Sequence, residues 1–154
     1  MSETYSKIKS EIVVAMKSKD SDRLLALRSL DSTIKNISIN LGHRDGPTED
    51  DVLSGLAQMI KRGLDSAEQF KNAGREDLFQ TESFQVSVAQ SFLPKQLTKE
   101  ELKEIIWKEL SEKELTQKDF GKLMKSFGES LKGKTDNKSI SEMIKNYFSE
   151  NGVK

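Results

Sequence analysis

The sequence predicts an all-α protein in two parts: an N-terminal bundle of about four helices (residues 1–94) and a small C-terminal domain of three helices (residues 95–154). Three observations support this prediction. Apolar residues recur every three or four positions along most of the chain, as they do on the buried face of a helix. No segment alternates apolar and polar residues between turn signals, so no strand is expected. Only two prolines, Pro47 and Pro94, interrupt the 154 residues.

The first two helices are defined by apolar stripes with a polar turn between them. One stripe covers residues 5–16 and the other covers residues 24–41, and residues 19–21 separate them. Gly42 ends the second stripe, because glycine is the residue that most often follows a helix C-terminus. We therefore expect two helices, followed by a turn-rich loop over residues 42–47.

The third and fourth helices precede Pro94. Thr48, with Asp51 three residues later, is a capping-box pattern that opens an apolar stripe over residues 52–70. A fourth stripe covers residues 78–93 and is ended by Pro94, because proline cannot continue a helix and restricts the residue before it. Pro94 is therefore also the expected boundary between the two parts.

Three helices follow Pro94, and each has a capping residue before an apolar stripe. The first helix is capped by Thr98 and has its stripe over residues 102–110. The second is capped by Thr116 with Asp119 and has its stripe over residues 120–131. The third is capped by Asp136 or Ser139 and has its stripe over residues 140–148.

The composition excludes several classes of protein. Basic and acidic residues number 25 each, and Leu, Ile, Val and Phe together number 39, which is enough for a modest core. There is no cysteine, so disulfides, thiolate metal sites and a catalytic thiol are excluded. Since the chain also lacks a secretory signal peptide and a long apolar run, we expect a cytoplasmic protein without membrane contact. The single histidine, His43, is expected to be a solvated loop residue, so no metal site, cofactor or catalytic residue is predicted.

One segment matches the phosphate-loop pattern of nucleotide hydrolases. Residues 128–135 fit Gly, four residues, Gly-Lys-Thr, but such loops follow a buried strand, whereas residues 120–127 have helical spacing. We interpret the segment as a helix end followed by a glycine turn. The turn is basic, since residues 118–145 contain seven lysines and four acids; residues 7–35 have the same excess of three. A solvated helix face and an RNA-contacting face both explain such an excess.

Several strings, read in order, resemble the YqeY family. They are AMKSKD (15–20), RLLALR (23–28), IKN (34–36), AGREDL (73–78), FLPKQL (92–97), DFGKLM (119–124) and LKGK (131–134). The resemblance extends from about residue 4 to residue 149. YqeY proteins are stand-alone relatives of the tail of the GatB subunit of tRNA-dependent amidotransferases.

The resemblance implies an all-helical, two-part protein with a connection to tRNA, because the related tail helps to hold the tRNA. A similar module is fused to some glutaminyl-tRNA synthetases. The family label is carbon–nitrogen ligase activity with glutamine as amido-N-donor, but catalysis in the amidotransferase belongs to parts that these 154 residues do not contain. The resemblance thus implies tRNA, an aminoacyl-tRNA synthetase or an amidotransferase as partners. Two alternatives stay open: a protein-interaction module without RNA contact, and a component linked to the ligase activity.

The glycine turn departs from the family string, which is usually Lys-Gly-Arg-Ala-Asp-Gly-Lys. Residues 132–138 here are Lys-Gly-Lys-Thr-Asp-Asn-Lys, and the second lysine and the threonine create the phosphate-loop match, which is therefore a coincidence. We expect a non-catalytic, tRNA-associated accessory protein whose basic residues meet backbone phosphates. The candidate RNA-binding residues are Lys122, Lys125, Lys132, Gly133, Lys134 and Lys138.

Overall fold

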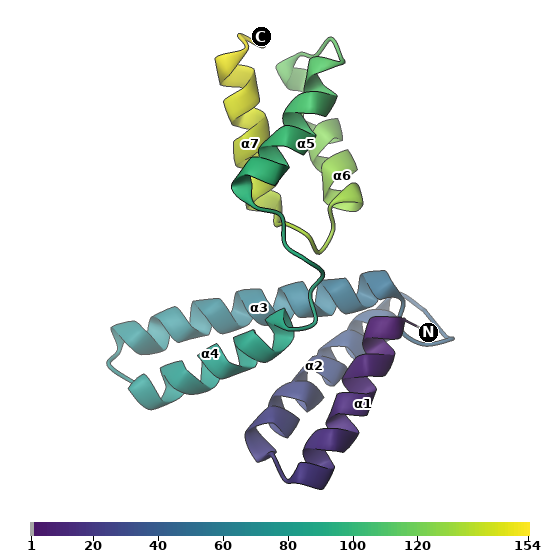
Figure 1. Ribbon diagram of the computed structural model, residues 1–154, viewed down its shortest axis with the longest axis vertical. Helices are drawn as coiled ribbons and strands as arrows, with labels where there is room; N and C mark the ends of the chain where they lie inside the picture. The colour runs from purple at the N-terminus through teal and green to yellow at the C-terminus, as the bar shows by residue number, and fades with distance from the viewer. Residues whose placement is uncertain (1) are drawn as a thin grey trace. The chain divides into compact units, whose positions relative to one another are not determined.

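The structure is a computed structural model that describes residues 2–154, and within that range it contains seven α-helices, one short 3-10 helix and no β-strand. The predicted all-α class is thus confirmed. The chain divides into two compact units, the first ending at Leu93 and the second comprising Pro94–Lys154 (Figure 1).

The first unit consists of two helical hairpins (Figure 1). Helix α1 (Glu3–Ser18) packs against α2 (Ser21–Asn40), and α3 (Glu49–Asn72) packs against α4 (Glu76–Gln90). Helix α2 also contacts α3 and α4 and so joins the hairpins. The core lies at this junction, and its fully buried side chains include Ile8, Leu27, Leu30, Ile34, Val52 and Leu56.

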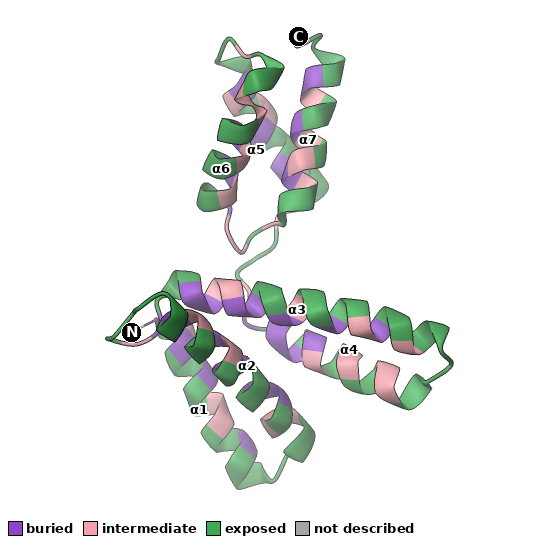
Figure 2. Cartoon of the chain, turned by 180° about the vertical axis from the view of Figure 1, so that it is seen from behind, coloured by how far each residue is buried: buried purple, intermediate pink, exposed green. Residues whose placement is uncertain are grey.

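Close packing in the first unit depends on two helical glycines. A Cβ placed on Gly63 of α3 would lie 2.4 Å from Cγ2 of Val86 in α4, and one on Gly55 would lie 2.6 Å from Cγ1 of Ile34 in α2. Between Val86 and the tip of this hairpin, α4 contributes no buried residue, since none of residues 76–85 is buried (Figure 2). The glycines therefore set how closely α3 approaches both neighbours.

The helix ends follow the sequence signals with small differences. The capping box predicted at Thr48 is present: its hydroxyl accepts from the N–H of Asp51, whose carboxylate accepts from the N–H of Thr48. Gly42 follows α2 with a φ of 77°, a conformation that favours glycine. Helix α4 ends at Gln90, one turn earlier than the stripe up to Pro94 indicates, and the next turn is closed by hydrogen bonds between residues three apart.

Three residues of the apolar stripes are exposed although their spacing places them in the core. They are Met16 (51% exposed), Leu41 (62%) and Ile105 (37%). Periodicity identifies the apolar face of a helix but not the part of that face that another helix covers.

Two carboxylates are buried in the first unit. Asp31 accepts a hydrogen bond of 2.8 Å from the hydroxyl of Tyr5 and lies 2.9 Å from Nζ of Lys35. Asp51 is 1% exposed, and its Oδ2 lies 2.7 Å from Nδ1 of His43. His43 is an exposed loop residue, as the sequence predicts, but its ring is also the partner of a buried carboxylate, which the sequence does not indicate.

The second unit is a three-helix bundle. It comprises α5 (Lys99–Ser111), η1 (Gln117–Asp119), α6 (Phe120–Ser130) and α7 (Asn137–Glu150), with α7 packed against both α5 and α6. Its core contains Leu102, Ile106, Leu110, Leu123, Phe127, Ile140 and Ile144. Asp136, rather than Ser139, caps α7. Because α6 continues through Gly128 to Ser130, the phosphate-loop match follows a helix, as the sequence interpretation has it.

Candidate nucleic-acid interface

The candidate residues lie on one continuous helix–loop–helix segment, residues 120–138. It consists of α6, the glycine loop (residues 131–136) and the first turn of α7. Lys122 and Lys125 are exposed on α6, opposite the core residues of that helix, and Lys134 and Lys138 are exposed beyond it. Lys132 and Gly133 are partly buried. Folding thus leaves four of the six candidates exposed.

The glycine loop is a tight turn whose backbone is hydrogen-bonded to the first residues of the second unit. Gly133 has a φ of 80°, which a residue with a side chain rarely adopts. Nε2 of Gln96 donates to the carbonyl of Gly133 at 2.6 Å, and the N–H of Leu97 donates to the carbonyl of Lys134 at 2.9 Å. These bonds hold the backbone of the loop while the side chain of Lys134 stays exposed.

Basic residues of the two units differ in their ion pairs. In the first unit Lys9 and Lys35 pair with Asp31, and Arg23 pairs with Glu11. Within residues 2–154, no ion pair, hydrogen bond or aromatic contact is found for the ammonium groups of Lys122, Lys125, Lys134 and Lys138. Ion pairs inside the fold thus use part of the positive excess of the first helical pair, whereas Lys122, Lys125, Lys134 and Lys138 of the helix–loop–helix segment remain available to an external anion.

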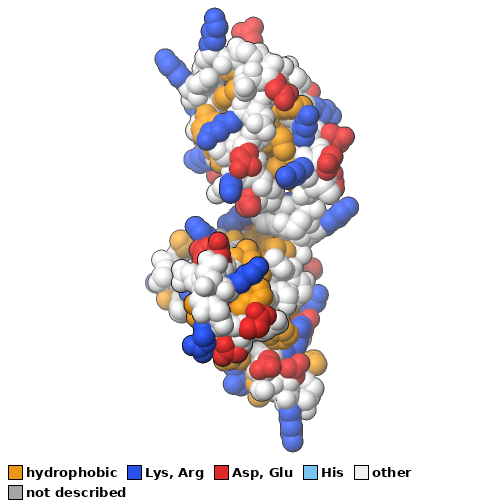
Figure 3. All heavy atoms as spheres, turned by 90° about the vertical axis from the view of Figure 1, so that its left-hand side faces the viewer, with side chains coloured by type: hydrophobic (Ala, Val, Ile, Leu, Met, Phe, Trp, Pro, Cys, Tyr) orange, Lys and Arg blue, Asp and Glu red, His pale blue; other side chains and the backbone are white. Residues whose placement is uncertain are grey.

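Two carboxylates in the same segment oppose anion binding. Asp136 stands at the N-terminus of α7 and accepts a hydrogen bond of 2.7 Å from the N–H of Ser139, so this first-turn amide is already bonded. Glu129 lies one helical turn after Lys125 on α6. Residues 120–138 contain five lysines and these two carboxylates, so the segment carries a moderate formal positive charge. Charges of both signs are also interspersed over the face of the molecule that Figure 3 shows.

Helices α6 and α7 are antiparallel, and two contacts define their register. Near the glycine loop, a Cβ on Gly128 would lie 3.5 Å from Oδ1 of Asn137. At the other end, Nζ of Lys145 lies 5.7 Å from the ring centre of Phe120. Lys138 and Lys145 are seven residues apart and therefore share one side of α7. This side of α7 thus has one lysine near the glycine loop and another beside Phe120 of α6.

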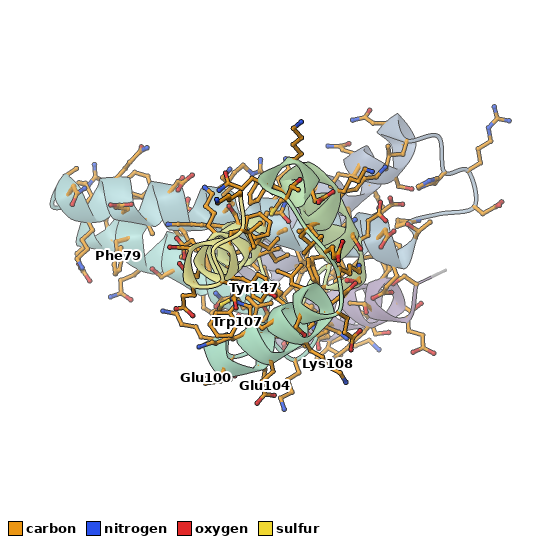
Figure 4. All side chains as sticks on the ribbon, turned by 90° about the horizontal axis from the view of Figure 1, so that it is seen from above. Phe79, Glu100, Glu104, Trp107, Lys108 and Tyr147 are labelled. Carbon is orange, nitrogen blue, oxygen red and sulfur yellow. The ribbon has the colours of Figure 1, made fainter. Side chains whose placement is uncertain are left out.

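The aromatic pair Trp107 and Tyr147 lies at the contact of α5 with α7 (Figure 4). The ring centres are 6.1 Å apart, and Nζ of Lys103 lies 3.7 Å from the ring centre of Trp107. Nε1 of Trp107 is buried without a hydrogen-bond partner among the described atoms. Because Lys103 already covers the indole and Glu100 and Glu104 lie on the outer side of α5 (Figure 4), this pair is separate from the basic segment.

Other kinds of site are not found in the described part of the chain. Residues 2–154 contain no cluster of three or more His, Asp or Glu side chains that could hold a metal ion. No helix in that range combines the length and the hydropathy that crossing a membrane requires.

The fold and the site define a two-part, all-helical protein whose second part presents a basic helix–loop–helix segment. The chain belongs to the YqeY family, since the family model described as Yqey-like protein matches residues 5–148.

Three curated relatives share the name "Altered inheritance of mitochondria protein 41, mitochondrial". The relative from Clavispora lusitaniae is 32% identical over 101 residues, which are 64% of this chain and 58% of that protein. The relative from Pyrenophora tritici-repentis is 28% identical over 141 residues, which are 90% of this chain and 77% of that protein. The relative from Eremothecium gossypii is 30% identical over 87 residues, which are 56% of this chain and 46% of that protein. The chain thus spans about half to three quarters of the length of these relatives.

The names of these relatives contradict the cytoplasmic location expected from the sequence, because each is named as a mitochondrial protein. That expectation was wrong because it rested on the absence of cysteine and of a secretory signal peptide. Neither property distinguishes the cytoplasm from an organelle that proteins reach by another route.

For three residues that shape the site, no functional role is predicted from the sequence. Gln96 holds the glycine loop, and the only sequence signal for it is its place in the family string at residues 92–97. Asp136 is recognisable as a helix cap, but its negative charge also lies among the candidate lysines. Lys145 could have been found from its spacing of seven residues after Lys138.

Proposed function

We propose that the chain is a non-catalytic, tRNA-associated accessory protein of the GatB/YqeY type that holds backbone phosphates of tRNA with its helix–loop–helix segment. The observation that carries the proposal is the group of exposed lysines without a partner in residues 2–154: Lys122, Lys125, Lys134 and Lys138. Lys132 and the turn at Gly133 complete the surface. Lysine contacts of this kind position RNA without reading its sequence.

The charge balance supports weak, auxiliary binding. The formal net charge of the chain is zero, and Glu129 and Asp136 lie among the lysines. A protein with so few phosphate contacts binds weakly at physiological salt, and the slope of log Kd against log salt is only about one unit per contact, because each contact releases its condensed counterions into the solution. We propose that an aminoacyl-tRNA synthetase or an amidotransferase acting on the same tRNA supplies the remaining affinity.

A salt titration of tRNA binding tests the proposal with the full chain. Three proteins are compared: the native chain, Lys134→Ala/Lys138→Ala, and the charge-matched control Lys17→Ala/Lys61→Ala, which removes two exposed lysines of the first unit. The slope of log Kd against log salt should fall by about one unit per phosphate-contacting lysine. We therefore expect a fall of about two units in the first variant and an unchanged slope in the control.

Two outcomes contradict the proposal: no binding to total tRNA at low salt, or equal losses of affinity in the two double variants. A protein-interaction module without RNA contact predicts a different pattern, in which a partner protein stays bound at high salt and after ribonuclease treatment. A pull-down with and without ribonuclease distinguishes the two.

The non-catalytic part of the proposal has its own measurement. The chain contains no cysteine that could attack glutamine, which supports the assignment of ligase chemistry to other proteins. We expect the purified chain to release no ammonia from glutamine. Release above that of a heat-denatured sample would refute this part alone.

A further inference from the structure

The second unit contains a concavity that the proposed phosphate contacts do not use. Its volume is about 670 Å³, which lies within the usual range of ligand sites, roughly 300–1,000 Å³. It lies where η1 and the start of α6 meet the C-terminal end of α7. Its lining includes Gln117, Phe120, Lys145, Phe148, Ser149 and Lys154.

Aromatic and cationic groups meet in this concavity. Phe148 is 6% exposed and contributes to the floor, whereas Phe120 is only partly buried. Nζ of Lys145 is 5.7 Å from the ring centre of Phe120, close to the outer limit of about 6 Å for a cation–π contact, so the ammonium is held weakly. No side chain among the described residues that line the concavity is acidic, and the backbone oxygen of Lys154 there accepts a hydrogen bond of 3.2 Å from the N–H of Gln117. An accessible ring beside a loosely held cation fits a planar aromatic ligand with a negative charge.

The concavity lies on the same side of α7 as Lys138 of the basic segment. Lys145 follows Lys138 by seven residues, a rise of about 10 Å along the helix. About three stacked nucleotides cover that distance, at roughly 3.4 Å each. A strand whose phosphates contact Lys138 therefore reaches the concavity within a few nucleotides.

We propose that this concavity binds a single unstacked base of the RNA, with the base against the ring of Phe120 and the adjoining phosphate on Lys145. When the ammonium of Lys145 pairs with the phosphate, the ring face that it partly covers becomes available to the base. The inference rests on the proposed function and adds the RNA feature that is recognised: an unpaired nucleotide in a loop or at an end. Aromatic side chains bind such bases by stacking, with little preference among the four bases.

The test uses the full chain and two synthetic oligonucleotides of equal length, one single-stranded RNA and one abasic strand with the same number of phosphates. We expect the RNA to bind roughly tenfold more tightly than the abasic strand at the same salt. Phe120→Leu should abolish this difference without changing the affinity for the abasic strand. The control Phe84→Leu, which alters a phenylalanine that is 40% exposed on α4, should keep the difference.

A measurement without any variant makes the test independent of how well Phe120→Leu folds. An RNA that carries the fluorescent base 2-aminopurine should become brighter on binding the native chain, because the base leaves the neighbouring bases that quench it. Unchanged emission, or equal affinity for the RNA and the abasic strand, overturns the base site while phosphate binding stands. Equal weakening of both strands by Phe120→Leu also overturns it. If the native chain binds neither strand at low salt, the proposed function fails, and the base site fails with it.

Discussion

Nδ1 of His43 donates a hydrogen bond of 2.7 Å to the carboxylate of Asp51, which is 1% exposed. The same carboxylate accepts from the N–H of Thr48 at 2.9 Å. Burial raises the pKa of Asp51, but the hydrogen bonds from Thr48 and His43 and the charge of His43 lower it by more, so the net pKa is below its ordinary value. The capping box of α3 thereby also holds the loop that precedes the helix.

Loss of the His43 side chain should destabilise the first unit. We expect His43→Ala to lower the free energy of unfolding by about 1–3 kcal/mol near neutral pH, because a buried carboxylate loses a hydrogen-bond partner. Arg44→Ala, at an exposed position in the same loop, should change it by less than about 0.5 kcal/mol. Urea unfolding measures both. Equal effects of the two substitutions would show that the hydrogen bond to Asp51 contributes nothing.

Acid should destabilise the chain through its buried carboxyls. Burial raises the pKa of Asp31, but hydrogen bonds from Lys35 and Tyr5 and the charges of Lys9 and Lys35 lower it by more, so its net direction is downward, as for Asp51. A carboxyl whose folded-state pKa lies below its unfolded value, about 3.9, contributes fully above that pH and loses its contribution as the pH falls through the folded-state pKa. We therefore expect stability to fall below about pH 4.

The variant Asp31→Asn isolates this effect. It should be less stable than the native chain at pH 7, because the amide cannot form the ion pairs with Lys9 and Lys35. Between about pH 4 and pH 2 it should lose less stability than the native chain, since one titrating group is gone. Urea unfolding at several pH values gives both curves. Parallel curves would contradict the role assigned to Asp31.

Substitution of Gly63 should reveal how closely α3 and α4 pack. An added Cβ would lie 2.4 Å from Cγ2 of Val86, which is 4% exposed and cannot move freely. We expect Gly63→Ala to destabilise the chain by about 1–3 kcal/mol. In a Val86→Ala background the same substitution should be neutral or stabilising, because the clash is absent and alanine favours a helix.

Gly121 provides the matched control for Gly63. It lies within α6, and a Cβ there meets nothing within 4 Å, so Gly121→Ala should stabilise the chain by about 0.5–1 kcal/mol. Thermal or urea unfolding of the variants measures these effects. Destabilisation by Gly63→Ala that persists in the Val86→Ala background would show that the close approach is not the cause.

The charge of Asp136 can be separated from its capping role. Asn caps a helix about as well as Asp, so Asp136→Asn should change the free energy of unfolding by less than about 0.5 kcal/mol. If the lysines around the glycine loop contact RNA, removal of this negative charge should tighten tRNA binding at low salt by roughly two- to fivefold. The charge-matched control is Asp45→Asn, in an exposed loop of the first unit. Equal tightening by both variants would point to net charge alone.

The helices are predictable from the sequence because their signals are local. Thr48 and Thr98 each act on an amide three residues later, and apolar spacing reports the buried face within one helix. The hydrogen bond from Gln96 to Gly133 spans 37 residues, and no local pattern encodes it. His43 illustrates the same limit at short range, since its partner depends on how the loop closes.

The candidate site is predictable only in part, because the availability of a charged side chain depends on contacts between residues far apart in the sequence. Composition identifies a basic segment, but two of the ion pairs that distinguish it from the equally basic first helices, Lys9–Asp31 and Arg23–Glu11, form between α1 and α2. Lys9 and Lys134 look alike in the sequence. Lys9 is paired with Asp31 of the neighbouring helix in the fold, and Lys134 is exposed on a loop. Tertiary contacts decide which charges stay available.

The two hydrogen bonds that hold the glycine loop determine where a fragment containing only the second unit should begin. Gln96 and Leu97, which supply the donors to the loop carbonyls, precede the first residue of α5. A fragment that begins at Thr98 would keep all three helices and yet leave the carbonyls of residues 133 and 134 without these donors. Its far-UV circular dichroism would match that of the native helices, although the glycine loop had lost these two hydrogen bonds. Fragments intended to report on this loop should therefore begin no later than Pro94.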